Sequence, residues 1–115
     1  METIIKKITH TEEDKKIYEQ AGQILRAGGL VAFPTETVYG LGADALDAKA
    51  SAKIYAAKGR PSDNPLIVHI ADVNALYDLA KEVPDKALVL SEKFWPGPMT
   101  LIFKKSALVP YGTTG

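Results

Sequence analysis

Apolar runs of strand length alternate with amphipathic stretches along the chain, and glycine or proline marks most of the boundaries between them. The expected strands are residues 3–8, 30–33, 66–70 and 100–103. In the intervening stretches apolar residues recur at helical spacing, which predicts helices over residues 12–27, 48–58, 73–80 and 85–94. Strands that alternate with helices predict an α/β fold with a substantially parallel sheet.

Residues with capping chemistry support these helix limits. Thr11, Asp47 and Asp72 each precede a predicted helix, where a side-chain oxygen accepts a backbone N–H that has no partner inside the helix. Gly28 and Gly59 follow predicted helices, where glycine readily adopts the left-handed conformation that ends a helix. The first two helices therefore have both of their ends predicted.

The chain has the size and composition of one domain. Its 115 residues and hydrophobic fraction of 46% are sufficient for a core, and the sequence contains no internal repeat or low-complexity linker. Residues 1–115 are therefore assigned to a single domain. Residues 106–115 are turn-like, as in a chain that stops within a loop, so we expect the domain to be truncated at its C-terminal side.

Charge and cysteine content exclude several classes of protein. The chain carries 14 basic and 14 acidic residues, and this zero net charge gives no support for non-specific nucleic-acid binding. The absence of cysteine excludes disulfides and thiolate metal sites. No apolar stretch approaches the roughly 18 residues of a membrane span, and the N-terminus lacks the pattern of a secretion signal. We therefore expect a cytoplasmic protein without a membrane partner.

The segment 34–42, Pro-Thr-Glu-Thr-Val-Tyr-Gly-Leu-Gly, follows a predicted strand, and ligands of α/β sheets bind at such strand ends. Polar residues are also common in ordinary connections, so composition leaves a structural and a binding role equally open. Gly-Leu-Gly at 40–42 is not a dinucleotide fingerprint, because Ala45 replaces its third glycine, and no P-loop sequence is present. The polar side chains of the segment are Thr35, Glu36, Thr37 and Tyr39.

A second polar loop, residues 58–65, begins at the end of a predicted helix and contains two prolines, which limit its freedom. Lys58 and Arg60 place two cations in it, and arginine can hold phosphate oxygens through its planar fork. Asn64 adds amide donors and an acceptor for a base, ribose or phosphate. A cation at a helix C-terminus is favoured by the helix dipole, so Lys58 alone has a structural explanation. The combination favours anion binding.

His69 interrupts the apolar strand at 66–70. A lone histidine in such a strand is more commonly a core residue than a catalytic one. Glu36 and Asp63 are acids in the two loops, but two acids this far apart do not define a metal site, and none is assigned. We identify no nucleophile or catalytic base.

Taken together, these segments resemble the Sua5/YciO/YrdC family. The blocks PTETVYGLG and KGRPxxNPL are highly specific in combination, and the matching segments follow one another in the family's order. They are residues 29–42, 58–66, 69–70 and 94–101.

The resemblance implies an open, twisted sheet, parallel or mixed, with helices packed on it. It also implies synthesis of L-threonylcarbamoyladenylate from L-threonine, bicarbonate and ATP, for the threonylcarbamoyl modification of adenosine 37 in tRNA. The implied partners beyond these substrates are Mg²⁺ with the ATP, tRNA or double-stranded RNA, and downstream threonylcarbamoyl-transfer proteins. The threonine site would comprise Thr35, Thr37, Tyr39 and His69, and the nucleotide site Lys58, Arg60 and Asn64.

Further site residues of the family come after the position where this sequence stops. We therefore expect the 115 residues to hold about half of a site and to be inactive alone. One alternative is an RNA-binding YrdC-like module without catalysis, against which the neutral charge counts. The other is the carbamoyl-adenylate-handling domain of a hydrogenase-maturation carbamoyltransferase. Those proteins carry upstream acylphosphatase and zinc-finger modules, whereas here residues 3–8 lead directly into the domain.

Overall fold

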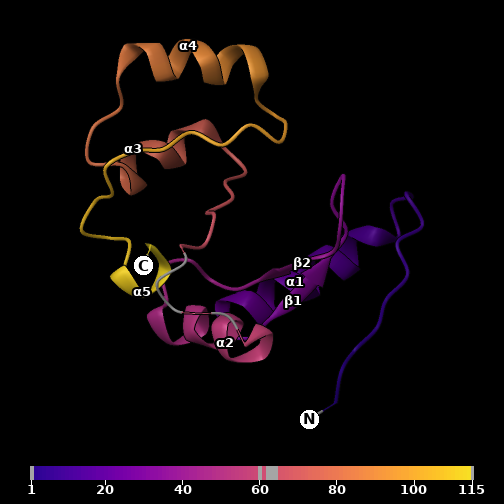
Figure 1. Cartoon of the computed structure of the whole chain (residues 1–115). Helices are drawn as coiled ribbons and strands as arrows, with labels where there is room; N and C mark the ends of the chain where they lie inside the picture. Colours follow the sequence, from indigo (N-terminus) through magenta and orange to yellow (C-terminus); the bar gives the residue numbers. More distant parts are fainter. Residues whose placement is uncertain (1, 60, 62–64, 115) are drawn as a thin grey trace.

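The computed structural model describes residues 2–59, 61 and 65–114. The elements follow one another as shown in Figure 1. They are α1 (Asp14–Arg26), β1 (Val31–Phe33), β2 (Gly40–Gly42), α2 (Ala48–Lys58), η1 (Val73–Ala75), α3 (Leu76–Leu79), α4 (Asp85–Phe94) and α5 (Tyr111–Thr114). Helices combine with a small open sheet, which confirms the predicted α/β class.

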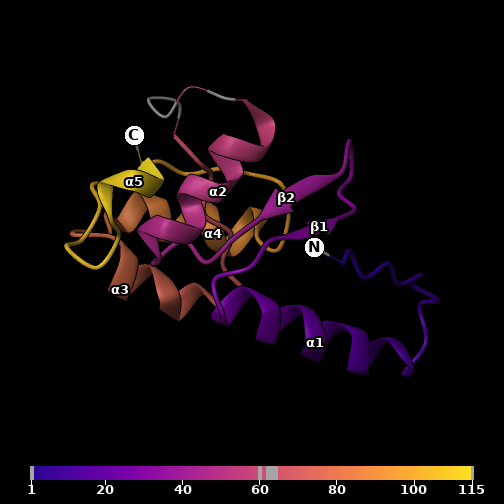
Figure 2. The same cartoon turned by 90° about the horizontal axis from the view of Figure 1, so that it is seen from below.

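The elements form two groups in space. Figure 1 shows α3 and α4 one above the other at one end of the molecule, and α2 beside α5 at the other. Contacts between α2 and α5 hold these two helices together. Figure 2, turned by 90°, shows α1 along the flank of the molecule next to the β1–β2 hairpin. Downstream of α4 the chain returns past α3, where the Lys81 N–H donates to the Lys104 carbonyl at 2.7 Å.

The sheet is an antiparallel hairpin, in which Val31 pairs with Gly42 and Phe33 with Gly40. Its pairing is antiparallel rather than parallel because six residues join the strands, whereas a parallel pair needs a crossover of about a dozen or more. The Phe33 ring covers both glycines. A Cβ at Gly40 would lie 2.8 Å from that ring and one at Gly42 2.9 Å from it, so the ring can pack here only against glycine.

Three of the predicted strands are not strands in the described part of the chain. Residues 3–8 are almost entirely exposed. Residues 66–70 alternate between half-buried and exposed, and residues 101–103 do the same, which is the period expected of a strand with one covered face. Neither segment has a ladder partner among the described residues; an isolated bridge at Ala80 and Lys105 is the nearest approach to one. The sequence has the apolar runs expected of strands, but a strand also requires a neighbour.

The start of α1 differs from the prediction because Asp14, not Thr11, organises it. The buried Asp14 carboxylate accepts the Thr9 N–H at 3.0 Å, the His10 N–H at 2.8 Å and the Thr9 hydroxyl at 2.8 Å. These bonds, the one from the Thr9 backbone foremost, lower the pKa of Asp14 below its ordinary value. The Thr11 hydroxyl instead bonds that of Thr9 at 2.7 Å.

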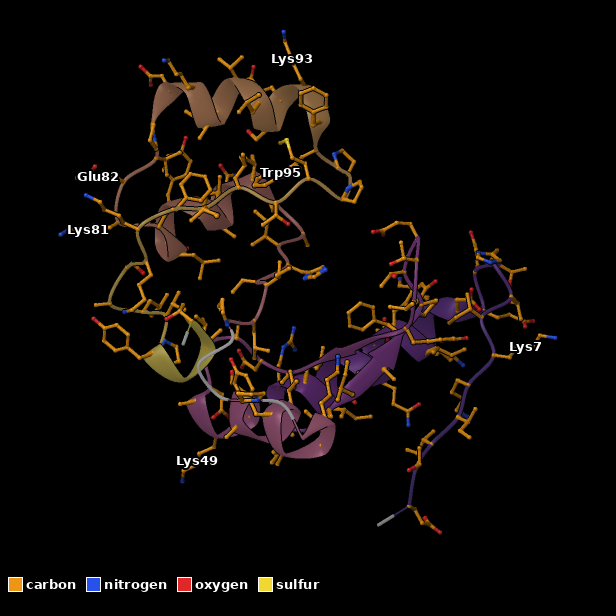
Figure 3. All side chains as sticks on the ribbon, viewed as in Figure 1. Lys7, Lys49, Lys81, Glu82, Lys93 and Trp95 are labelled. Carbon is orange, nitrogen blue, oxygen red and sulfur yellow. The ribbon has the colours of Figure 1, made fainter. Side chains whose placement is uncertain are left out.

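The other predicted helix limits are confirmed. Asp47 caps α2, accepting the N–H of Lys49 at 2.9 Å and that of Ala50 at 3.2 Å, and Gly59 ends it with a φ of 62°. Asp72 accepts the Asn74 N–H at 2.9 Å and begins η1, which continues into α3. α4 covers the predicted range. In the turn that follows it, the Trp95 indole N–H donates to the Met99 carbonyl at 2.8 Å (Figure 3).

Buried apolar residues are few for a chain of this length. The accessible surface is 9031 Å², against about 6,100 Å² expected for a compact monomer of 12.4 kDa. The radius of gyration is 15.2 Å, against about 13 Å for a compact domain. Much apolar surface therefore faces solvent. None of the described helices has the length and apolar character needed to cross a membrane. The buried apolar residues are Ala50, Ile54, Tyr55, Leu76, Ala80 and Val109.

Candidate substrate-binding site

The polar segment after β1 is the loop of the hairpin, and its first hydroxyl shapes it. Thr35 Oγ1 accepts the Thr37 N–H at 3.2 Å and donates to the Val38 carbonyl. The Thr37 hydroxyl lies 3.4 Å from that of Thr35. Both threonines and Tyr39 are exposed, Tyr39 by 76%. The loop therefore presents the Thr37 hydroxyl and the Tyr39 phenol to solvent on a turn fixed by Thr35.

His69 is exposed, so its interpretation as a core residue is wrong. Its ring lies edge-on to that of Phe33, with 6.1 Å between the ring centroids and 74° between the planes. Its Nδ1 lies 3.2 Å from the Ile67 carbonyl oxygen, which can orient the ring. Because Phe33 is the last residue of β1, this contact brings His69 next to the hairpin that carries Thr37.

A shallow hollow of about 360 Å³ adjoins His69. Asp44 and Asp78 are among the residues that line it, and the remaining lining residues are apolar apart from the histidine. One carboxylate oxygen of Asp44 already accepts a hydrogen bond, from the Leu46 N–H at 2.9 Å. A small amphipathic molecule with a cationic group would suit this lining. The apolar lining residues are Ala45, Leu46, Val68, Ile70, Ala71, Ala75, Leu79 and Leu108.

Lys58 is the last residue of α2 and is exposed. It makes no hydrogen bond or ion pair with another described residue. Its ammonium group is therefore available to an anion. Arg60, Asp63 and Asn64 lie outside the described residues, so the clustering predicted for the second loop stays a prediction.

A pair of buried hydroxyls was not singled out from the sequence. Ser51 in α2 and Thr113 in α5 bond to each other at 2.8 Å, although they lie 62 residues apart, and each is 1% exposed. Small polar residues such as these are common at surfaces, and no local pattern distinguishes a buried pair. Only the packing of α5 on α2 reveals it.

The described geometry is that of an α/β domain with exposed hydroxyls in its hairpin loop, an exposed imidazole beside the hairpin and an exposed lysine at the end of α2. The Sua5_yciO_yrdC family model, described as "Telomere recombination", matches residues 23–115, and the chain belongs to this family. The resemblance stated above on sequence motifs is thereby confirmed.

Curated relatives are consistent with this assignment. The chain is 56% identical over 113 residues to a threonylcarbamoyl-AMP synthase of Pyrococcus abyssi, covering 98% of this chain and 33% of the relative. It is 59% identical over 98 residues to that of Bacillus subtilis, covering 84% of this chain and 28% of the relative. The chain thus spans about a third of the length of the relatives it matches.

Solved structures share the fold. A structure of the H234A/Y235A variant of P. abyssi Sua5 matches with a TM-score of 0.85 and 57% identity, over 92% of this chain and 32% of that one. A crystal structure of P. abyssi Sua5 complexed with L-threonine matches with a TM-score of 0.80 over 87% of this chain and 29% of that one. The arrangement of the described elements is therefore that of Sua5.

Proposed function

We propose that the protein containing these residues is an L-threonylcarbamoyladenylate synthase. It would make threonylcarbamoyl-AMP and pyrophosphate from L-threonine, bicarbonate and ATP. The observation that carries the proposal is the contact of His69 with Phe33, which brings an exposed imidazole beside the hairpin whose loop has exposed hydroxyls. The names of the relatives and the threonine complex of P. abyssi Sua5 support the same activity.

Threonine would bind between the hairpin and His69. The Thr35 hydroxyl is already used within the loop, so Thr37 and Tyr39 have the hydroxyls available to a substrate. The ammonium group of threonine would suit the two acidic residues that line the adjoining hollow, and His69 would contact the substrate from the neighbouring segment. In this arrangement Thr35 shapes the site and the other residues touch the ligand.

The chemistry needs positioning and charge rather than a protein nucleophile. The threonine amine attacks bicarbonate, and loss of water gives a carbamate. A carbamate oxygen then attacks the α-phosphorus of ATP, and the bond to the β-phosphate oxygen breaks to release pyrophosphate. Both reactants are anions, so cations must offset their repulsion. We propose that Lys58 and Arg60 supply this positive charge and that Asn64 adds hydrogen bonds to the nucleotide.

Mg²⁺ would enter with ATP. The described residues contain no cluster of three or more histidine or acidic side chains that could hold a metal, so the phosphate oxygens would supply its ligands. The ion would neutralise charge on the triphosphate. We propose no protein metal site.

The product is an activated acyl adenylate, and its use falls to other proteins. We propose that it serves transfer proteins that modify adenosine 37 of tRNA, with synthesis in the cytoplasm. Direct binding of tRNA or double-stranded RNA by this chain is a further expectation. The zero net charge requires that any such surface be local.

The activity is tested by pyrophosphate release from ATP in the complete gene product that contains this chain. Release should require both threonine and bicarbonate, and the adenylate should be detected by mass spectrometry. Pyrophosphate release that ignores threonine would contradict the proposal. Salt-dependent RNA binding without turnover would favour the non-catalytic RNA-binding module instead.

The nucleotide site is tested at Arg60. Arg60→Ala should weaken binding of a non-hydrolysable ATP analogue by about 1.5–3 kcal/mol, the scale of a charge-assisted hydrogen bond. Calorimetric titration measures this loss. Arg26, the only other arginine of the chain and an exposed residue at the end of α1, provides the matched control as Arg26→Ala. Equal affinities of the two variants would remove Arg60 from the nucleotide site.

The threonine site is tested at His69. His69→Ala should raise the KM for threonine much more than that for ATP, because the imidazole lies beside the hairpin that carries Thr37. The only other histidine provides the control as His10→Asn, since asparagine tolerates the positive φ of 60° at that position. A folded His69→Ala protein with ordinary threonine kinetics would return His69 to a purely structural role.

A further inference from the structure

The α2–α5 contact contains a hydrogen-bonded cluster whose centre is Thr113. Its hydroxyl donates to the Ala45 carbonyl at 2.7 Å and lies 2.8 Å from the Ser51 hydroxyl. Its carbonyl accepts the Leu66 N–H at 2.9 Å. Thr113 is 1% exposed, so water cannot replace any of these bonds without a structural change.

The direction of each bond follows from the number of protons. A threonine hydroxyl has a single proton, and a carbonyl can only accept, so the Thr113 proton is committed to Ala45. Ser51 must therefore donate its own proton to Thr113 Oγ1. Every buried side-chain polar atom of the described residues has a partner, and the cluster is fully satisfied. Removing the Thr113 hydroxyl would leave the Ser51 hydroxyl without its acceptor and the Ala45 carbonyl without its donor.

The partners of Thr113 belong to three segments, of which two carry proposed substrate residues and the third leaves the hairpin. Ala45 lies in the connection that leaves the hairpin, downstream of β2. Ser51 lies in α2 two turns before Lys58, on the same side of the helix. Leu66 begins the segment that carries His69 three residues later. The hydroxyl and the backbone carbonyl of Thr113 thus connect three parts of the chain. They are the connection after β2, the α2 helix and the segment that contains His69.

We propose that Thr113 is a positioning residue, which holds the segments of Lys58, of His69 and of the hairpin connection in register for the reaction. It touches no substrate in this scheme and acts only through its hydrogen bonds. The inference rests on the proposed synthase function. It goes beyond that function by assigning a role to a residue outside the polar loops.

The kinetic test compares Thr113→Val, which keeps the shape of the side chain and removes the hydroxyl, with Thr113→Ser, which keeps the hydroxyl. In the complete gene product, Thr113→Val should lower kcat/KM for threonine and for ATP together, by about 10- to 100-fold, the scale of an ångström-sized misplacement. Thr113→Ser should stay close to wild type. The assays are run well below the unfolding midpoint of each variant.

Ser91→Ala is the matched control. Ser91 is 3% exposed, and its hydroxyl bonds the Leu88 carbonyl at 2.7 Å within α4, far along the chain from the proposed substrate residues. This variant loses a buried serine hydroxyl and should keep its kinetics. If Thr113→Val only lowers the unfolding midpoint and leaves kcat/KM for both substrates unchanged, Thr113 is merely structural and the proposal is overturned.

Hydrogen exchange separates this proposal from the function on which it rests. Amide exchange measured by mass spectrometry should rise in residues 44–58 and in residues 65–70 together in Thr113→Val, and in neither in Ser91→Ala. A wild-type protein without synthase activity would refute the proposed function, while the exchange result would still decide whether Thr113 holds these segments. Faster exchange confined to residues 111–114 would overturn the inference.

Ser51→Ala provides a second variant if Thr113→Val does not fold. It removes one bond of the cluster and leaves Thr113 bonded to Ala45, so a smaller effect of the same kind is expected, with exchange raised in residues 44–58 and both values of kcat/KM lowered. Unchanged exchange and kinetics in a folded Ser51→Ala protein would contradict the proposal.

Discussion

The α2 and α4 helices have nearly the same length, 11 and 10 residues, yet they differ in how they are held. α2 buries two apolar and two small residues at helical spacing, and α5 packs on it. α4 buries only Ser91, while Val89, Leu90 and Phe94 are exposed. The buried residues of α2 are Ala50, Ser51, Ile54 and Tyr55.

The ends of the two helices differ in the same sense. α2 has a side-chain cap from Asp47 and a left-handed glycine after its last residue. α4 begins after Pro84 without any side-chain cap. The helix that ends in the proposed phosphate-binding Lys58 is thus fixed at both ends and along its length. The helix with no proposed substrate contact presents an apolar face of the kind that other protein surfaces cover.

The largest expected effect is complete loss of turnover in the 115-residue chain. The P. abyssi relative is about three times as long, and here Lys58 is exposed to water, which weakens its charge interactions. Threonine- and bicarbonate-dependent pyrophosphate release should therefore be absent from residues 1–115 and present in the complete gene product. The shorter chain should also bind a hydrophobic dye or self-associate. Comparable turnover by the two proteins would show that the described loops suffice.

The next effect concerns stability and compares one residue from each helix. Ile54→Ala should lower the free energy of unfolding by about 2–5 kcal/mol, because it creates a cavity between α2 and its neighbours. Val89→Ala in α4 should change it by less than about 0.5 kcal/mol in the 115-residue chain. Urea denaturation measures both. Similar losses would remove the contrast, and a larger loss for Val89→Ala in the complete gene product would show that α4 is covered there.

The helix ends give a smaller effect. Asp47→Ala should cost about 1 kcal/mol of stability, since it leaves two N–H groups of α2 without their acceptor. Asp85→Ala, at the first residue of α4, removes only a favourable charge near the helix N-terminus and should cost no more than about 0.5 kcal/mol. Thermal unfolding of the two variants tests the order. An equal or larger loss for Asp85→Ala would contradict it.

The smallest effect is a dependence on pH that belongs to neither helix. The folded-state pKa of Asp14 lies below its ordinary value of 3.8, so its carboxylate stabilises the fold above that pH, and this contribution is lost as the pH falls through the folded-state pKa. Asp14→Asn should therefore be less stable than wild type at pH 7, and the difference should shrink in acid. The exposed neighbour Glu13 provides the control as Glu13→Gln. A difference that stays constant with pH would exclude the carboxylate as its source.

How far the sequence predicts this structure depends on the range of the interaction. Helix limits were predictable where a local cap decides them, as at Asp47, Asp72 and Gly59. The expected strand at 66–70 was not, because an apolar run is a local signal, whereas a strand also needs a ladder partner from elsewhere in the chain. The start of α1 was misassigned to Thr11 because a buried carboxylate that accepts three bonds has the same local pattern as an ordinary acid in a first helical turn.

The site divides in the same way. Thr37 and His69 stood out through the resemblance, and the structure brings their segments together. The Phe33 ring connects these segments, because it packs against Gly40, Gly42 and His69. A short apolar strand in the sequence does not predict these contacts. The Thr113–Ser51 bond joins residues 62 positions apart, and no spacing rule covers such a pair.

The position of Trp95 has a consequence for spectroscopy. It is the single tryptophan of the chain, and it lies in the turn directly after α4, with its indole N–H bound to the Met99 carbonyl. Its emission therefore reports on the sparsely buried end of the molecule, whereas the aromatic residue buried in α2 is Tyr55. A shift of indole fluorescence on addition of ATP would place a ligand-induced change at α4, remote in sequence from Lys58. Tyrosine absorption would not isolate α2 in the same way, because Tyr55 is one of five tyrosines in the chain.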